Sequence, residues 1–305
     1  MFKGSIVALV TPFKGDRVDE AAYKKLIDWQ IHEGTSGIVP CGTTGESPTL
    51  SEKEHEQVIE LCVKAVGKRV PVIAGTGSNS TSEAVSMTKH AAKVGADAAL
   101  VVTPYYNKPT KKGIYLHYKA VSESVDIPIV LYNISGRTGR NIDPELMAKM
   151  ASDFKNIVGV KEASGSLDQI LRIKELCPKS FFITSGDDAL TLPILAIGGI
   201  GVISVAANIV PRDVAAVIDA FNKGDLKKAQ EINLKLMPLV RALFIETNPI
   251  PVKKACEMMG LCNGSLRLPM CDMEDANMAK LKQALSSYGL LKKESKSKGP
   301  MVAAL

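Results

Sequence analysis

The sequence predicts an α/β protein, a (β/α)8 TIM barrel with a C-terminal helical extension, and three observations carry this prediction. Short Val/Ile/Ala-rich runs alternate eight times with helix-length amphipathic segments. Each run is apolar throughout, as expected for a parallel strand covered on both faces. The alternation stops near residue 224, and only helical patterns follow. Eight strand–helix units favour a closed barrel over an open doubly wound sheet.

The expected strands are the short apolar runs at residues 6–10, 37–40, 71–74, 98–102, 128–132, 157–161, 181–185 and 201–205. Ser51 with Glu54, and Ser80 with Glu83, predict capping boxes, in which these side chains bind the free N–H groups of a helix's first turn. Helix ends are predicted at glycines that tolerate a left-handed cap, namely Gly34, Gly67 and Gly95. After the barrel, helices are expected at 225–246, 251–259 and 274–288.

These patterns divide the chain of 305 residues into a catalytic barrel domain, residues 1–223, and a helical domain, residues 224–305. From about residue 292 the chain is rich in Lys, Ser and Gly, so we expect a basic, flexible tail. The net charge of the chain is +6, and four of the lysines that contribute to it lie in this tail. Aromatic residues make up only 5% of the chain. A nucleic-acid-binding surface is therefore not expected.

No apolar stretch is long enough to cross a membrane, and residues 1–13 lack the layout of a signal peptide. We therefore expect a cytoplasmic protein without a membrane partner. The six cysteines include no Cys-x-x-Cys pair and are interpreted as reduced thiols. A zinc site built from Cys256, Cys262 and Cys271 is disfavoured, because their spacing is unpaired and no histidine is near.

Polar residues gather where the expected strands end. Runs rich in hydroxyl groups, amides and glycine leave the strands at 42–46, 75–79, 103–107, 132–133, 161–162 and 185–188. The connections that enter the strands, such as 67–69 and 94–96, carry no such groups. Because all strand ends of a barrel share one face, where catalytic residues lie, this asymmetry predicts an enzyme.

Lys161 ends the apolar run Ile-Val-Gly-Val-Lys (157–161). Burial disfavours the charged ammonium and so favours a neutral, nucleophilic amine. A neutral amine is what Schiff-base chemistry on a carbonyl substrate requires. The alternative is a strand-end lysine whose stem reaches water.

Three neighbouring features favour the nucleophile. Tyr132 ends the preceding strand, so its phenol can shuttle protons near the amine, although a half-buried structural tyrosine is the alternative. Arg137 follows on the next loop, as a carboxylate ligand or a surface arginine. The loop containing Thr43 and Thr44 is either a carboxylate cradle or a simple glycine turn.

Nothing in the sequence predicts a cofactor or a metal. The glycine-containing loops lack the Gly-Lys-Ser/Thr ending of a phosphate loop and the third glycine of a dinucleotide fingerprint. The four histidines all fall in predicted helices, namely His32, His55, His90 and His117. A metal-dependent aldolase needs histidine ligands in the barrel mouth, so their placement favours lysine-based chemistry.

Taken together, the motifs resemble those of the pyruvate-dependent Schiff-base lyases, the N-acetylneuraminate lyase-like class I aldolases. The resemblance covers residues 2–290 and rests on Gly-Thr-Thr-Gly-Glu (42–46), Pro-Tyr-Tyr-Asn (104–107), Tyr-Asn (132–133), Gly-Val-Lys-Glu (159–162), Gly-Asp-Asp (186–188), Gly-Val-Ile-Ser (201–204) and Asn-Pro-Ile-Pro (248–251). Within this family the chain is most similar to the branch that serves lysine and diaminopimelate biosynthesis.

The resemblance implies that Lys161 forms an imine with pyruvate. The enamine then attacks the aldehyde of L-aspartate 4-semialdehyde, and the adduct cyclises to 4-hydroxy-tetrahydrodipicolinate. Tyr132 is implied as the proton donor, relayed through Thr43 and through Tyr106 of a neighbouring subunit. The implied substrate-binding set is Thr44, Arg137, Gly186 and the backbone of Ile203.

Other members of the family are N-acetylneuraminate lyase and aldolases that act on 2-keto-3-deoxy sugar acids or 4-hydroxy-2-oxoglutarate, which are the alternative activities. Arg137 and the double threonine favour the synthase branch, since sialic-acid members tend to show Gly-Ser-Thr-Gly and lack this arginine. Ser135 departs from the usual proline and frees the backbone φ. A catalytically dead barrel that serves as a binding protein is the alternative from another class.

The resemblance also implies a homotetramer, built as a dimer of dimers, with Tyr106 crossing the tight interface. Many members are inhibited by L-lysine in a cleft between subunits. The matching positions here are Ser47, His55, Asn79, Glu83 and Tyr105. Glu52 stands where some lysine-sensitive members carry histidine. We therefore expect L-lysine to be an allosteric effector.

Overall fold

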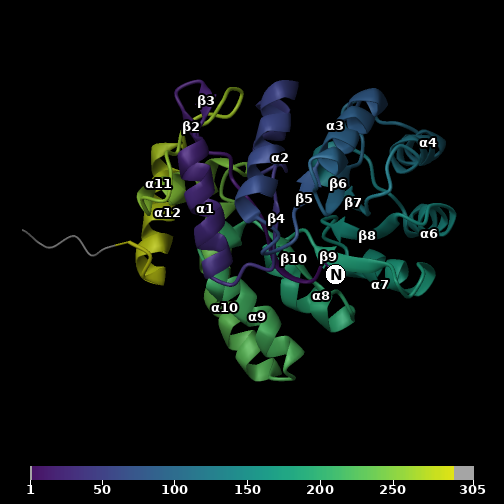
Figure 1. The fold of residues 1–305 in the computed structure, drawn as a ribbon. Helices are drawn as coiled ribbons and strands as arrows, with labels where there is room; N and C mark the ends of the chain where they lie inside the picture. The colour runs from purple at the N-terminus through teal and green to yellow at the C-terminus, as the bar shows by residue number, and fades with distance from the viewer. Residues whose placement is uncertain (1, 292–305) are drawn as a thin grey trace, which may run out of the picture.

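The computed structural model describes residues 2–291, and its centre is a barrel of eight parallel strands (Figure 1). The strands are β1 (Gly4–Ala8), β4 (Gly37–Val39), β5 (Ile73–Gly75), β6 (Ala98–Val102), β7 (Ile129–Asn133), β8 (Ile157–Glu162), β9 (Phe182–Ser185) and β10 (Gly201–Ser204). Each strand pairs with its neighbours in this order, β10 pairs with β1, and a bridge from Ile38 to Val72 closes the ring between β4 and β5. The predicted barrel is confirmed.

Helices cover the outside of the barrel and follow the strands in turn (Figure 1). They are α1 (Glu20–His32), α2 (Glu52–Val66), α3 (Thr81–Lys93), α4 (Lys111–Ser122), α6 (Pro144–Asp153), α7 (Leu167–Leu176), α8 (Thr191–Ile197) and α9 (Pro211–Asn222). A short extra helix, α5 (Ser135–Thr138), lies between β7 and α6. A parallel strand pair requires such a crossover, and the buried strand faces are the reason that each run is apolar throughout.

The predicted helix ends are largely correct. Ser51 Oγ accepts from the Glu54 N–H at 3.3 Å, and Glu54 Oε2 accepts from the Ser51 N–H at 3.0 Å, so this capping box forms. The second capping box is wrong, because Ser80 makes no side-chain cap to its helix. Glu83 instead accepts from the Ser78 hydroxyl at 2.7 Å. The predicted glycine caps all adopt positive φ, at Gly34, Gly67 and Gly95.

Three helices follow the barrel, namely α10 (Leu226–Leu243), α11 (Ile250–Met258) and α12 (Asp275–Tyr288), each within three residues of its expected bounds. Their buried residues belong to the same apolar cluster as barrel residues. This cluster contains Val7 and Tyr23 together with Leu281 and Leu285. The division at residue 223 stays a prediction, and the basic tail from 292 lies outside the described residues.

A small two-stranded hairpin, β2 (Phe13–Lys14) and β3 (Arg17–Val18), was not expected from the sequence. It lies between β1 and α1, and its strands are too short to produce a periodic pattern. None of the described helices has the length and hydrophobicity needed to span a bilayer.

The interior of the barrel is filled by its own apolar cluster, formed by Ile6, Ala8, Val39, Ile73, Ala98, Leu100, Val130, Tyr132 and Ile203. These side chains come from six of the eight strands, as in the layered core of a closed barrel. Tyr132 and Ile203 belong to this cluster and lie near the carboxyl ends of their strands. The packed interior therefore leads directly to the face where polar residues gather.

Candidate active site

Lys161 and Tyr132 lie side by side at the carboxyl ends of adjacent strands. They are register partners in the β7–β8 ladder, and paired residues of neighbouring strands point to the same side of the sheet. Lys161 Nζ is 4.2 Å from the centre of the Tyr132 ring. Only 6% of Lys161 is exposed. The structure therefore brings the predicted nucleophile and the predicted proton donor together in a buried place.

Gly186 borders the stem of Lys161. A Cβ atom at this position would lie 3.1 Å from Lys161 Cε and 2.7 Å from Ala163 Cβ, closer than ordinary carbon contacts. The Gly186 N–H donates to the Glu162 carbonyl at 2.8 Å, which holds the two strand ends together. Glycine suits this position because a side chain would collide with the Ala163 methyl group and crowd the stem of Lys161.

A buried polar network fixes the same two strand ends from outside the barrel. Asn133 Nδ2 donates to both Glu162 carboxylate oxygens, at 3.2 and 3.0 Å. Glu162 also accepts from the Ser164 N–H at 2.7 Å and from Gln169 Nε2 at 3.2 Å. Burial raises the pKa of Glu162, and these hydrogen bonds partly offset the effect. Sequence reasoning missed this network, although the alternation of a strand places residues 133 and 162 opposite to Tyr132 and Lys161.

The threonine loop, residues 42–46, leaves β4 and is held by side chains from distant parts of the chain. Thr44 is buried, and its Oγ1 accepts from Asn248 Nδ2 at 3.0 Å. The Gly45 carbonyl accepts from Thr11 Oγ1 at 2.7 Å. The Glu46 N–H donates to the Thr43 carbonyl at 3.1 Å, so the loop is a tight turn. Neither Asn248 nor Thr11 was a predicted site residue.

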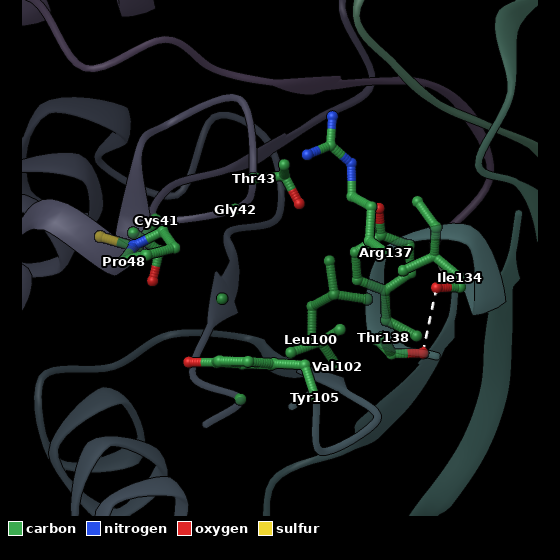
Figure 2. Close-up of a pocket in the computed structure, with 14 residues that line it drawn as sticks. Cys41, Gly42, Thr43, Pro48, Leu100, Val102, Tyr105, Ile134, Arg137 and Thr138 are labelled. Carbon is green, nitrogen blue, oxygen red and sulfur yellow. Dashed lines mark hydrogen bonds between the residues drawn. The ribbon is translucent and has the colours of Figure 1, made fainter. Parts of the chain in front are cut away.

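A cavity of about 210 Å³ opens beside these groups. It is lined by three of the predicted catalytic and substrate-binding residues, Thr43, Tyr132 and Arg137. Thr43 and Arg137 are labelled in Figure 2. Its other lining residues are Cys41, Gly42, Ser47, Pro48, Gly75, Gly77, Leu100, Val102, Tyr105, Ile134 and Thr138. Lys161 is not among the lining residues, but its Nζ lies against the ring of Tyr132, which is one of them. Figure 2 shows the Arg137 side chain extending on the side of the cavity where Thr43 lies.

Arg137 belongs to the short helix α5, and its Nη2 donates to the Asn248 carbonyl at 3.0 Å. Asn248 therefore contacts both residues, Thr44 through its side-chain amide and Arg137 through its backbone carbonyl. Ser135 is the first residue of α5. A proline is tolerated at a first helical position because the N–H group there has no partner within the helix. Serine and proline thus both suit this turn.

Besides Lys161, four predicted catalytic or substrate-binding residues do not line this cavity, namely Thr44, Gly186, Tyr106 and Ile203. Tyr106 is 88% exposed, with a positive φ of 69°, and no other part of the described chain covers it. Ile203 is buried in the barrel interior. The chain just after Ile203 is held by Asp188, whose Oδ2 accepts from the Val205 and Ala206 N–H groups at 2.9 and 3.1 Å.

The predicted effector residues are divided in the single chain. Ser47 and Tyr105 line the cavity. Glu83 is engaged by Ser78, and the Asn79 carbonyl accepts from Asn107 Nδ2 at 2.8 Å. His55 is buried, and neither of its ring nitrogens has a hydrogen-bond partner that meets ordinary geometry. Burial lowers the pKa of His55 to about 4, so the imidazole is neutral near pH 7.

Comparison with known proteins agrees with this geometry. The model of the dihydrodipicolinate synthetase family matches residues 1–288. The 4-hydroxy-tetrahydrodipicolinate synthase of Endomicrobium trichonymphae is 59% identical over 292 residues, which are 96% of this chain and all of that protein. The enzyme of the same name from Syntrophus aciditrophicus is 57% identical over 291 residues, 95% of this chain and all of its own.

Solved structures show the same fold. The crystal structure of dihydrodipicolinate synthase from Aquifex aeolicus has a TM-score of 0.94 and 52% identity, and covers 96% of this chain and all of its own. A synthase from Cyanidioschyzon merolae, solved with lysine bound, has a TM-score of 0.93 and 43% identity over 95% of this chain and 99% of that one. A synthase variant described as monomeric has a TM-score of 0.93 and 44% identity over 95% of this chain and 98% of its own. The chain belongs to the dihydrodipicolinate synthetase family.

Proposed function

We propose that the protein is a 4-hydroxy-tetrahydrodipicolinate synthase, a Schiff-base lyase of lysine and diaminopimelate biosynthesis. It condenses pyruvate with L-aspartate 4-semialdehyde on Lys161. The observation that carries this proposal is the buried pair of Lys161 and Tyr132 at the carboxyl ends of adjacent strands. Lys161 Nζ lies 4.2 Å from the centre of the Tyr132 ring. Identity of up to 59% to enzymes with this name supports the choice of substrates.

In the first half-reaction the neutral amine of Lys161 attacks the keto carbon of pyruvate, and water leaves as the imine forms. Loss of a proton from the methyl group gives an enamine. Tyr132 donates and accepts the protons of these steps, and its closeness to Lys161, whose Nζ lies 4.2 Å from the centre of the Tyr132 ring, supports this role. Thr43 lines the same cavity, which supports its role as the next member of a proton relay.

In the second half-reaction the enamine carbon attacks the aldehyde carbon of the semialdehyde, and the new oxyanion takes up a proton. Arg137 extends along the same cavity, where a planar guanidinium suits the carboxylate of this substrate. Thr44 and the backbone of Ile203 hold the carboxylate of pyruvate, and Gly186 leaves room for the lysine stem. Attack of the amino group on the former keto carbon then closes the ring and releases Lys161.

The proposal extends to assembly and control. Tyr106 completes the proton relay of a neighbouring subunit in a homotetramer, since it projects from its own chain with 88% exposure. L-lysine is the effector, bound by Ser47, His55, Asn79, Glu83 and Tyr105. The lysine-bound relative from Cyanidioschyzon merolae supports this assignment. The protein works in the cytoplasm.

Reductive trapping tests the nucleophile and the substrate together. Wild-type protein treated with pyruvate and borohydride should gain one reduced pyruvate adduct, which peptide mapping should place on Lys161. Lys161→Ala should lose both the adduct and turnover, while Lys155→Ala, an exposed lysine on the approach to the same strand, should keep both. Turnover of N-acetylneuraminate instead of L-aspartate 4-semialdehyde, or no adduct at all, would contradict the proposal.

A further inference from the structure

We infer that Lys253 is a positioning residue for this reaction. Lys253 lies on helix α11, outside the barrel, and forms an ion pair with Glu46 that we call the grip. This ion pair holds the threonine loop in the arrangement in which Thr43 and Thr44 act. The inference rests on the proposed function, and it assigns to the C-terminal helices a part in the active site.

Lys253 is fully buried, and every one of its three ammonium hydrogens has an acceptor. Nζ donates to Glu46 Oε1 at 2.6 Å, to the Thr11 carbonyl at 2.9 Å and to the Ser265 carbonyl at 2.6 Å. The ring of Phe13 lies 4.2 Å away on another side. Burial lowers the pKa of Lys253, and the carboxylate of Glu46 acts in the opposite direction without cancelling this effect. Such complete saturation of a buried cation holds the side chain in one position.

Of these three acceptors of Lys253, Glu46 alone belongs to the threonine loop. Its second carboxylate oxygen accepts from the Arg267 N–H at 3.1 Å, so both oxygens are held from the C-terminal region. The backbone of Glu46 is in the left-handed region, with φ of 55°, a conformation that residues other than glycine rarely adopt. A conformation of this kind persists only where the surroundings impose it. The buried carboxylate grip is the contact that imposes it here.

The ion pair of Lys253 and Glu46 acts on the turn that carries the two threonines. The Glu46 N–H closes the turn on the Thr43 carbonyl at 3.1 Å. Thr11, whose carbonyl is bound by Lys253, also binds the Gly45 carbonyl through its hydroxyl. A freed Glu46 would therefore release the turn next to Thr44.

No other charged pair in the described part of the chain is as deeply buried, with exposed fractions of 0% and 1% for the two side chains. Burial of two charges is a poor way to gain stability alone, because apolar residues of similar size often do as well or better. We therefore attribute the presence of the Lys253–Glu46 pair beside the threonine loop to positioning of that loop.

The test removes the Lys253–Glu46 ion pair without leaving an unpaired buried charge. Glu46→Gln combined with Lys253→Met deletes both charges, so the variant should fold. At saturating pyruvate it should still trap the imine on Lys161, but kcat should fall at least tenfold and KM for pyruvate should rise at least tenfold. Glu46→Asp keeps both charges and shortens the side chain by one carbon, and it should shift KM for pyruvate in the same direction.

Leu281→Ala is the matched control, since it removes a buried side chain from α12 without touching the loop. It should lower the melting temperature but leave kcat and KM within twofold of wild type. The inference is overturned if the folded double variant or Glu46→Asp keeps wild-type kinetics, or if Leu281→Ala reproduces the kinetic losses. Failure of wild-type protein to trap pyruvate would instead overturn the proposed function.

Discussion

Replacing Gly186 by alanine would place a methyl group in the space that the Lys161 side chain occupies. The added carbon would lie 3.1 Å from Lys161 Cε, 2.7 Å from Ala163 Cβ and 3.2 Å from the Glu162 carbonyl oxygen. Carbon atoms prefer separations of about 3.5–4.0 Å, so roughly half an ångström or more must be recovered by movement. The Ala163 methyl group moves only with its backbone, so the chain segment 161–163 and the stem of Lys161 are both expected to shift.

Two magnitudes follow from this geometry. Overpacking of a buried site typically costs about 1–3 kcal/mol of folding free energy, which for a chain of 305 residues corresponds to a melting temperature lower by roughly 2–5 °C. A reacting group displaced by about 1 Å loses about 100-fold in rate, so the smaller shift expected here predicts a loss of about 10- to 100-fold in kcat. The catalytic loss should therefore exceed what the modest loss of stability explains.

The assay compares the rate of imine trapping by pyruvate and the steady-state kcat in Gly186→Ala and wild type. Gly136→Ala is the matched control, because a Cβ there meets no atom within 4 Å and the residue lies on the same face of the barrel. It should leave both rates within twofold. If Gly186→Ala forms the imine as fast as wild type, the steric argument about the lysine stem is refuted.

Three further predictions concern proton transfer, pH and regulation. Tyr132→Phe should still trap pyruvate on Lys161 at saturation but lose about 10²- to 10⁴-fold in kcat, as steady-state kinetics would show; unchanged kcat would remove Tyr132 from the relay. Burial lowers the pKa of His117 to about 4, below the unfolded value near 6.5, so the unfolded state binds more protons and stability falls as pH drops from 6.5 towards 4. Denaturant titrations of His117→Asn should show this dependence shallower by up to about 1.4 kcal/mol per pH unit, and an identical slope would contradict burial as its cause. L-lysine should lower initial rates at millimolar concentration, and Glu83→Ala should weaken that inhibition; a flat wild-type response would reject the effector.

The eight strands were predictable because continuous apolar runs of four or five residues have one stable use, as strands covered on both faces. The helix ends were mostly predictable from local chemistry, as at Ser51, whose partner lies three residues away. The same rule was wrong at Ser80, because Ser78 takes the glutamate that the pattern assigned to the cap. Local patterns cannot rank two nearby serines that compete for one carboxylate.

The candidate site shows the same limit at longer range. Lys161 and Tyr132 were predictable as partners because each ends an apolar run and the runs are consecutive, so their strands are neighbours. The contacts that hold the threonine loop were not predictable. Asn248 is 204 residues from Thr44, and Lys253 is 207 residues from Glu46. Neither spacing has a period or a motif that connects the two partners.

The sequence by itself determined the class of fold, and it predicted both the end of the barrel at which polar residues gather and the nucleophile that we propose. These depend on local alternation of apolar and polar residues and on strand ends that a closed barrel must bring to one side. Only the tertiary structure decided which distant groups hold the candidate site residues in place, as Asn248 does for both Thr44 and Arg137. Such contacts arise from packing between segments whose separation along the chain carries no signal, so they become visible only when the chain has folded.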